Sequence, residues 1–219
     1  MKKTSKALLL GLCALLLVGA SVLGTMAYLT STTEKVVNSF TVGNVNITLD
    51  EKDTDDSTPG ADRDTKNEYH LLPGSTYEKD PTVHVTAGSA KCYVFVKVEN
   101  GISTLEQPTG TNAAGRQVKT IAAQMEEKGW KAVTGENAPA NVFVYVGTEE
   151  NATDPAIVDA TAGKVDLEVF SEFTVGDAQT NDTLEAKKNE KINVTAYAIQ
   201  AEGWANNDAL AIWNAAKFN

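Results

Sequence analysis

The chain has 219 residues, of which 29 are acidic and 19 basic, and its formal net charge is −10 at pH 7. No cluster of Lys or Arg occurs beyond the first six residues, so little is available to neutralise phosphates, and a nucleic-acid-binding protein is disfavoured. The length predicts one domain with a single hydrophobic core.

The N-terminus has the three-part pattern of a bacterial export signal. Three lysines lie among the first six residues, an apolar run without charges follows over residues 7–23, and small residues come next. We therefore expect the protein to be secreted and to act in the extracellular space or at the cell surface.

Small residues at the −3 and −1 positions predict where this signal ends. Thr25 and Ala27 satisfy that pattern, so residues 1–27 are the predicted signal peptide, with cleavage between Ala27 and Tyr28. A weaker second cleavage site would lie directly after Ala20. Because no charge occurs from residue 7 to 33, an uncleaved membrane anchor is the alternative, and it would be the only contact with the membrane.

Alternating apolar and polar residues predict strands along most of the remaining chain. These strands are expected over residues 40–49, 82–85, 91–98, 141–146, 165–169, 173–175 and 191–200. Several short strands separated by turn residues are typical of a sandwich. The predicted fold class is therefore mostly β, an antiparallel jelly-roll or immunoglobulin-like β-sandwich over residues 41–219.

Two stretches have helical spacing instead. Residues 113–128 place apolar side chains on one face and end before Gly129, which predicts a helical insertion in the sandwich. Residues 208–217 predict a short C-terminal helix that Asn207 can cap. The acidic stretch 50–67 and the polar run 177–190 are expected to be solvated connections.

The search for catalytic or metal-binding residues yields no candidate, so we predict that the protein is not an enzyme and needs no cofactor. His70 and His84 lack the spacing of a zinc site, and Gly-x-Ser-x-Gly and phosphate-binding loops are absent from the sequence. Residues 53–57 alternate oxygen ligands as a calcium loop does, but Thr58 and Asp64 replace the Gly and Glu of an EF-hand. We expect a plain acidic loop there, with calcium binding as the alternative.

Cysteine use is sparse. Cys13 belongs to the predicted signal, so Cys92 would be alone in the mature chain and could form no intramolecular disulfide. We expect Cys92 to be a buried strand residue.

Several motifs, in order along the chain, resemble those of the TasA/camelysin family of Gram-positive exported proteins. They are Gly24-Thr-Met-Ala-Tyr-Leu-Thr, Val37-Asn-Ser-Phe-Thr-Val-Gly-Asn-Val-Asn-Ile-Thr-Leu-Asp-Glu51, Leu72-Pro-Gly-Ser-Thr-Tyr-Glu-Lys-Asp80, Gly88-Ser-Ala-Lys-Cys-Tyr-Val-Phe-Val-Lys-Val98, Ile192-Asn-Val-Thr-Ala-Tyr-Ala-Ile-Gln-Ala-Glu-Gly-Trp204 and Asp208-Ala-Leu-Ala-Ile-Trp213. The resemblance touches both ends and the middle of the chain.

This resemblance implies a jelly-roll-like sandwich whose signal is removed by a signal peptidase of the SipW type. It also implies self-association into matrix fibres, in which the N-terminal segment of one subunit completes the sheet of the next. Camelysin is assigned as a metallopeptidase, but this chain has no zinc motif that would carry that activity over.

Residues 28–40 are the candidate donor strand, a flexible segment that cleavage would free. Val36, Val37 and Phe40 are its expected anchors, because strand addition draws specificity from alternating side chains. The alternative is that residues 28–39 fray or fold back on their own domain.

The sequence therefore favours a secreted structural protein that self-assembles at the cell surface or in a biofilm matrix by donor-strand complementation. A monomeric adhesive or ligand-binding module is the alternative, and a camelysin-like metallopeptidase is the second alternative.

Overall fold

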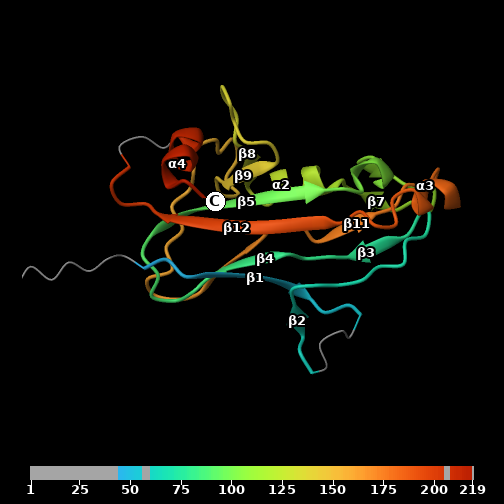
Figure 1. Ribbon diagram of the computed structural model, residues 1–219, viewed down its shortest axis with the longest axis horizontal. Helices are drawn as coiled ribbons and strands as arrows, with labels where there is room; N and C mark the ends of the chain where they lie inside the picture. The colour runs from blue at the N-terminus through green and yellow to red at the C-terminus, as the bar shows by residue number, and fades with distance from the viewer. Residues whose placement is uncertain (1–43, 56–59, 205–207, 219) are drawn as a thin grey trace, which may run out of the picture. The chain divides into compact units, whose positions relative to one another are not determined.

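The computed structural model describes residues 44–55, 60–204 and 208–218 (Figure 1). The chain divides into two units, and the first, Met1–Val42, lies outside these residues. The fold below is that of the second unit, Gly43–Asn219. No helix within the described ranges has both the length and the apolar character needed to cross a membrane.

The first sheet is antiparallel, with the strand order β10-β4-β1-β2. Its strands are β1 (Ile47–Lys52), β2 (Arg63–Asp64), β4 (Thr82–Val85) and β10 (Val165–Glu168). Val83 of β4 lies opposite Leu49 of β1 on one side and Leu167 of β10 on the other. Because side chains alternate across a strand, these three share the face that packs on the core.

The second sheet has the order β12-β5-β9-β8 and is also antiparallel. Its strands are β5 (Cys92–Asn100), β8 (Trp130–Ala132), β9 (Val142–Tyr145) and β12 (Ile192–Gln200). β5 is apolar on both faces and its Val94, Phe95 and Val96 are fully buried, as expected of a central strand. β12 pairs with β5 along its whole length.

Shorter elements complete the fold. They are strands β3 (Thr76–Glu78), β6 (Gly110–Thr111), β7 (Gln117–Val118) and β11 (Glu172–Thr174), the 3-10 helix η1 (Ser103–Leu105), and helices α2 (Ile121–Glu127), α3 (Asn181–Glu185) and α4 (Ala209–Ala216). β3 pairs with β11, and β6 pairs with β7.

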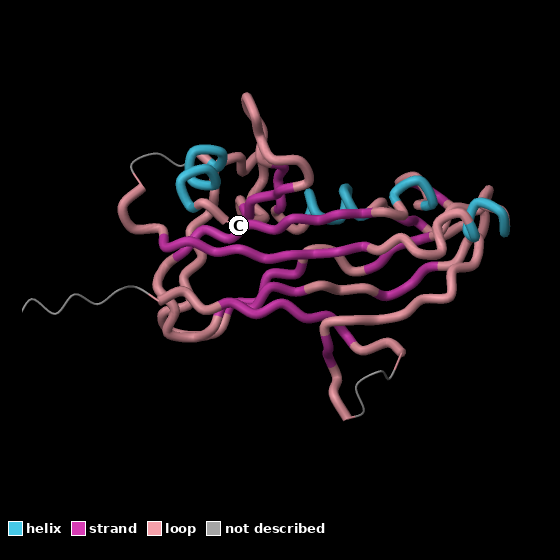
Figure 2. The backbone as a smooth tube through the Cα atoms, in the orientation of Figure 1, coloured by secondary structure: helices cyan, strands magenta, loops and turns pink. Residues whose placement is uncertain are grey.

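Two apolar clusters hold these layers together. The larger one lies between the sheets and includes Val83, Val94, Val96 and Phe173. The smaller one covers the opposite face of the second sheet, where Phe95 meets Trp213 at a ring-centroid distance of 5.5 Å. α4 therefore lies on the outer face of that sheet, as Figure 2 shows. The predicted β-sandwich with a helical insertion and a C-terminal helix is confirmed.

The predicted helix over residues 113–128 is wrong in its first half. The chain instead turns at Gly115, whose φ is +79°, so that β6 and β7 form a hairpin. The helix begins only after Thr120, whose hydroxyl oxygen accepts a hydrogen bond from the backbone N–H of Ala123 at 3.3 Å. Gly129 lies just beyond its end with φ +83°, as predicted for a helix C-terminus.

Three smaller expectations also change. Asp208, rather than Asn207, caps α4, because its carboxylate accepts from the N–H of Leu210 at 2.9 Å. The polar run 177–190 contains helix α3, which Thr180 caps. The acidic stretch 50–67 is not wholly solvated, since Glu51 is buried and β2 pairs with β1.

Candidate functional site

The outer edge of β12 has backbone groups that pair with no other strand in the described part of the chain. The N–H of Ala201 bonds the carbonyl of Lys91, and the N–H of Gly101 bonds the carbonyl of Lys191. In an antiparallel pair, alternate residues bond the partner, so the odd-numbered residues of β12 bond β5. The N–H and C=O groups of the even-numbered residues therefore point away from β5, and no described strand pairs with them.

The side chains of these even-numbered residues line an incompletely covered part of the core. Ile192, Val194, Ala196 and Ala198 pack against the cluster between the sheets, yet each is only partly buried. On the neighbouring β5, Val94 and Val96 are completely buried and Val98 is 5% exposed. Apolar surface at the β12 edge therefore stays accessible.

The facing part of the first sheet, where β2 pairs only with the last two residues of β1, has the same character. Val45, Ile47 and Leu49, which lie just before or within β1, also pack on the core and are also only partly buried. We call the seven residues on the two strands the β1–β12 seam: Val45, Ile47, Leu49, Ile192, Val194, Ala196 and Ala198. In Figure 1, β1 and β12 run along the same side of the two layers.

The opposite side of the sandwich is closed. There the indole N–H of Trp130 donates to the carbonyl of Glu168 at 2.9 Å, and Lys128 forms an ion pair with the Glu168 carboxylate at 2.7 Å. Gln124 of α2 also bonds the backbone of Ser171 and Glu172. α2 and β8 thus cover one lateral edge, whereas no described helix covers the β1–β12 seam.

The described chain begins at one end of this seam. The carbonyl of Asn44 accepts from the N–H of Ala90 at 3.1 Å, and the neighbouring Lys91 accepts from Ala201, the residue after β12. The predicted cleavage pair and donor anchors precede this point in the sequence. Ala27, Tyr28, Val36, Val37 and Phe40 lie outside the described residues.

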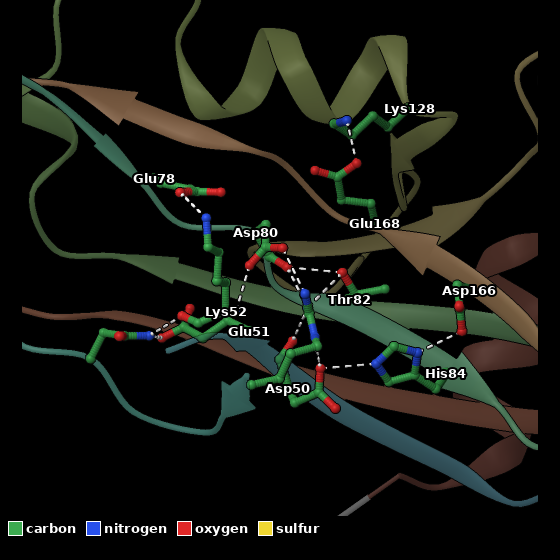
Figure 3. A network of polar contacts seen from close by, with 12 residues as sticks. Asp50, Glu51, Lys52, Glu78, Asp80, Thr82, His84, Lys128, Asp166 and Glu168 are labelled. Atoms are coloured by element: carbon green, nitrogen blue, oxygen red, sulfur yellow. Dashed lines mark hydrogen bonds and ion pairs between the residues drawn. The ribbon is translucent and has the colours of Figure 1, made fainter. Parts of the chain in front are cut away.

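A polar network lies on the outer face of the first sheet (Figure 3). His84 Nδ1 lies 2.6 Å from Asp166 Oδ1, and His84 Nε2 lies 2.9 Å from Asp50 Oδ1. The guanidinium of Arg63 reaches Asp50 and Asp80, with Nη1 at 2.7 Å from Asp80 Oδ2. His84 lies on the outer face of β4, and the two carboxylates and Arg63 come from other elements that sequence spacing did not connect to it.

The charged groups of this network lower the pKa values of two of its aspartates, Asp50 and Asp166. Burial alone would raise the pKa of Asp50, but hydrogen bonds from Arg63 and His84 hold it below the usual aspartate value. The pKa of Asp166 is lowered in the same way, against burial, by His84 and Lys164. Both ring nitrogens of His84 face carboxylates, so this arrangement ties three strands together rather than activating a nucleophile.

The acidic stretch that resembles a calcium loop forms a small cluster. Carboxylate oxygens of Asp53, Asp55 and Asp64 lie within 4.8 Å of one another. Asp64 comes from β2, so the structure gathers a different set from the five consecutive residues 53–57. Exposed acidic clusters of this kind are common without a metal, and neither histidine belongs to it.

Cys92 is buried, as expected, and burial raises the pKa of its thiol to about 11. A thiol that stays protonated at neutral pH is a poor nucleophile. A hollow with a volume of about 620 Å³ lies between α2, β8, β9 and the start of α4. It is open and mixed in polarity, with Glu126, Asp154 and Phe143 in its lining.

Comparison of the chain with protein-family models, with curated proteins and with solved structures finds no match.

Proposed function

We propose that this protein is an exported structural subunit that polymerises by strand addition. In this proposal, residues 28–40 of one copy pair with the outer edge of β12 in the next copy and cover its β1–β12 seam. The observation that carries the proposal is the edge of a nine-residue strand that no described strand pairs with and whose core-facing side chains remain partly exposed. Such an edge is a template for another chain unless it is guarded.

The seam and the proposed donor are chemically matched. The seam offers only aliphatic side chains, and the donor brings Val36 and Phe40, which alternation places on one face. Burying apolar side chains and pairing main-chain groups both favour association. If the donor is extended, alternation would place Val37 on its other face, so of the three proposed anchors it would contribute least to the seam contact.

The resemblance to the TasA/camelysin family supports the same proposal, and with it secretion, removal of the signal by a SipW-type peptidase and a place in a biofilm matrix or at the cell surface. The subunit would then act by assembly and not as an enzyme. The hollow beside α2 favours a monomeric ligand-binding module as the second candidate.

Changing the three donor anchors tests this function. The triple variant V36S/V37S/F40S should stay folded, because the compact unit Gly43–Asn219 has its own buried core, but it should lose polymerisation. Sedimentation and negative-stain microscopy measure the polymer. The matched single variant V37S should assemble better than V36S or F40S, because its side chain faces away from the seam. Filaments of the triple variant that equal those of the wild type would refute the donor assignment.

A further inference from the structure

Glu51 is an acidic residue on the core-facing side of β1. It continues the row of Ile47 and Leu49, and its side chain is only 7% exposed. Its Oε2 forms a very short contact with Nζ of Lys79, the residue that follows β3, whose side chain is 10% exposed. A dashed line from the labelled Glu51 marks this pair in Figure 3. Charges this deeply buried are costly unless their proton moves or further groups satisfy them.

The other oxygen of the Glu51 carboxylate accepts a hydrogen bond from a side-chain amide. Nδ2 of Asn67, in the loop after β2, donates to Glu51 Oε1 at 3.0 Å and to the carbonyl of Lys52 at 2.8 Å. Oδ1 of Asn67 accepts from both the backbone N–H and the hydroxyl of Thr54, at 2.6 and 2.9 Å. One buried carboxylate therefore touches a lysine amine and an asparagine amide at the same time.

We propose that Lys79 and Asn67 become joined by an intramolecular amide bond, with Glu51 as the proton carrier. Nζ of neutral Lys79 attacks Cγ of Asn67, the Nζ–Cγ bond forms, and the Cγ–Nδ2 bond breaks. Glu51 takes a proton from Nζ and delivers one to Nδ2, which leaves as ammonia. The reaction needs no oxidant, reductant or cofactor, because an amide and an amine give a new amide and ammonia.

The surroundings of the three residues suit each step. Proton transfer from Nζ to Oε2 leaves a neutral amine and a neutral acid, the forms that burial favours, and the amine is then a nucleophile. The ring of Tyr69 lies 5.9 Å from Nζ, and because the Lys79 side chain is only 10% exposed, water has little access to it. The two donors of Thr54 polarise the amide carbonyl and stabilise the negative charge that develops on Oδ1 during attack.

The bond would give the fold a covalent tie that its cysteines cannot supply. It would close the loop from β2 to the end of β3, next to the strand that lines the seam. A subunit with one cysteine in its mature chain gains from such a link because cross-links restrict the unfolded state. This inference does not depend on polymerisation, so either can fail alone.

Mass spectrometry of the purified wild-type protein tests the bond. The intact mass should be one ammonia below the mass of the sequence. Trypsin should not cleave after acylated Lys79, so a single peptide spanning residues 67–91 and lacking one ammonia should replace the separate peptides 67–79 and 80–91. A full mass with normal cleavage at Lys79 would overturn the proposal. Loss of ammonia with Lys79 still cleavable would indicate a succinimide at Asn67 and would overturn it too.

Variants identify the participants. Glu51→Gln removes the proton carrier, and Asn67→Ala removes the acyl group, so both should restore the full mass and cleavage at Lys79. Lys52→Met is the matched control, because it keeps the backbone carbonyl that Asn67 contacts and removes an exposed side-chain ion pair with Glu78, so the ammonia deficit should stay intact. A deficit that survives Asn67→Ala, or a water loss that joins Lys79 to Glu51, would contradict the assignment.

Discussion

Replacing Ala196 with proline is expected to abolish polymerisation while leaving the sandwich folded. Ala196 lies in the middle of β12, and its N–H points to the open edge, so proline removes no hydrogen bond to β5. It does remove a donor that an added strand would use, and its ring obstructs the approach of that strand. The expected result is a monomer at concentrations where the wild type sediments as filaments, with an unchanged circular dichroism spectrum.

The neighbouring residue provides the control for this variant. Thr195 bonds β5 through its backbone and exposes its side chain on the sheet face rather than at the edge. Thr195→Lys should therefore fold and polymerise like the wild type. If Ala196→Pro forms filaments at the same concentration as the wild type, then β12 is not the edge that receives the donor.

Replacing Arg63 with methionine is expected to destabilise the domain by about 2 kcal/mol at neutral pH, the size typical of hydrogen bonds to charged groups. Arg63 bonds Asp50, Asp80 and the hydroxyl of Thr82, and its side chain is 32% exposed. Methionine keeps much of the packing but leaves the Asp50 and Asp80 carboxylates partly uncompensated. Chemical denaturation gives the free energy of unfolding for both proteins.

The pH dependence of this difference separates charge from packing. Because the folded-state pKa of Asp50 lies below its usual value, the carboxylate stabilises the fold above about pH 4, and that contribution is lost as pH falls through the lowered pKa. Without Arg63 the Asp50 carboxylate contributes less stability that protonation can remove. The difference in free energy of unfolding between the two proteins should therefore narrow as the pH falls. Lys66→Met removes a highly exposed ion pair with Glu68, which contributes little to stability, and its free energy of unfolding should stay close to that of the wild type throughout. A gap that is independent of pH would assign the effect of Arg63 to packing.

Most strands could be predicted because their side-chain alternation is local. The segments 82–85 and 191–200 were expected within one residue of the observed β4 and β12. The helical start near residue 113 failed because its apolar spacing is also compatible with a hairpin, and Gly115 and the Thr120 cap decide between the two. Local patterns place helix boundaries poorly when turn and cap residues compete.

The candidate sites depended on contacts that no local pattern contains. The apolar alternation of β12 was evident, but its partial burial follows from its position at the end of a sheet, opposite β1. Glu51 looked like part of a solvated acidic loop, and its burial against Lys79 requires β3 to fold back beside β1. Only one signal pointed to it in advance: Glu51 continues the core-facing alternation of Ile47 and Leu49.

The central claim is that residues 28–40 of one copy complete the sandwich of another. Negative-stain microscopy and sedimentation of purified Tyr28–Asn219 beside a Thr41–Asn219 truncation test it most directly, over a range of concentration and pH. We expect filaments from the longer protein only. The truncated protein should stay monomeric, because no donor segment is left to pair with its β12 edge. Monodisperse monomers from both proteins, or filaments from both, would contradict it.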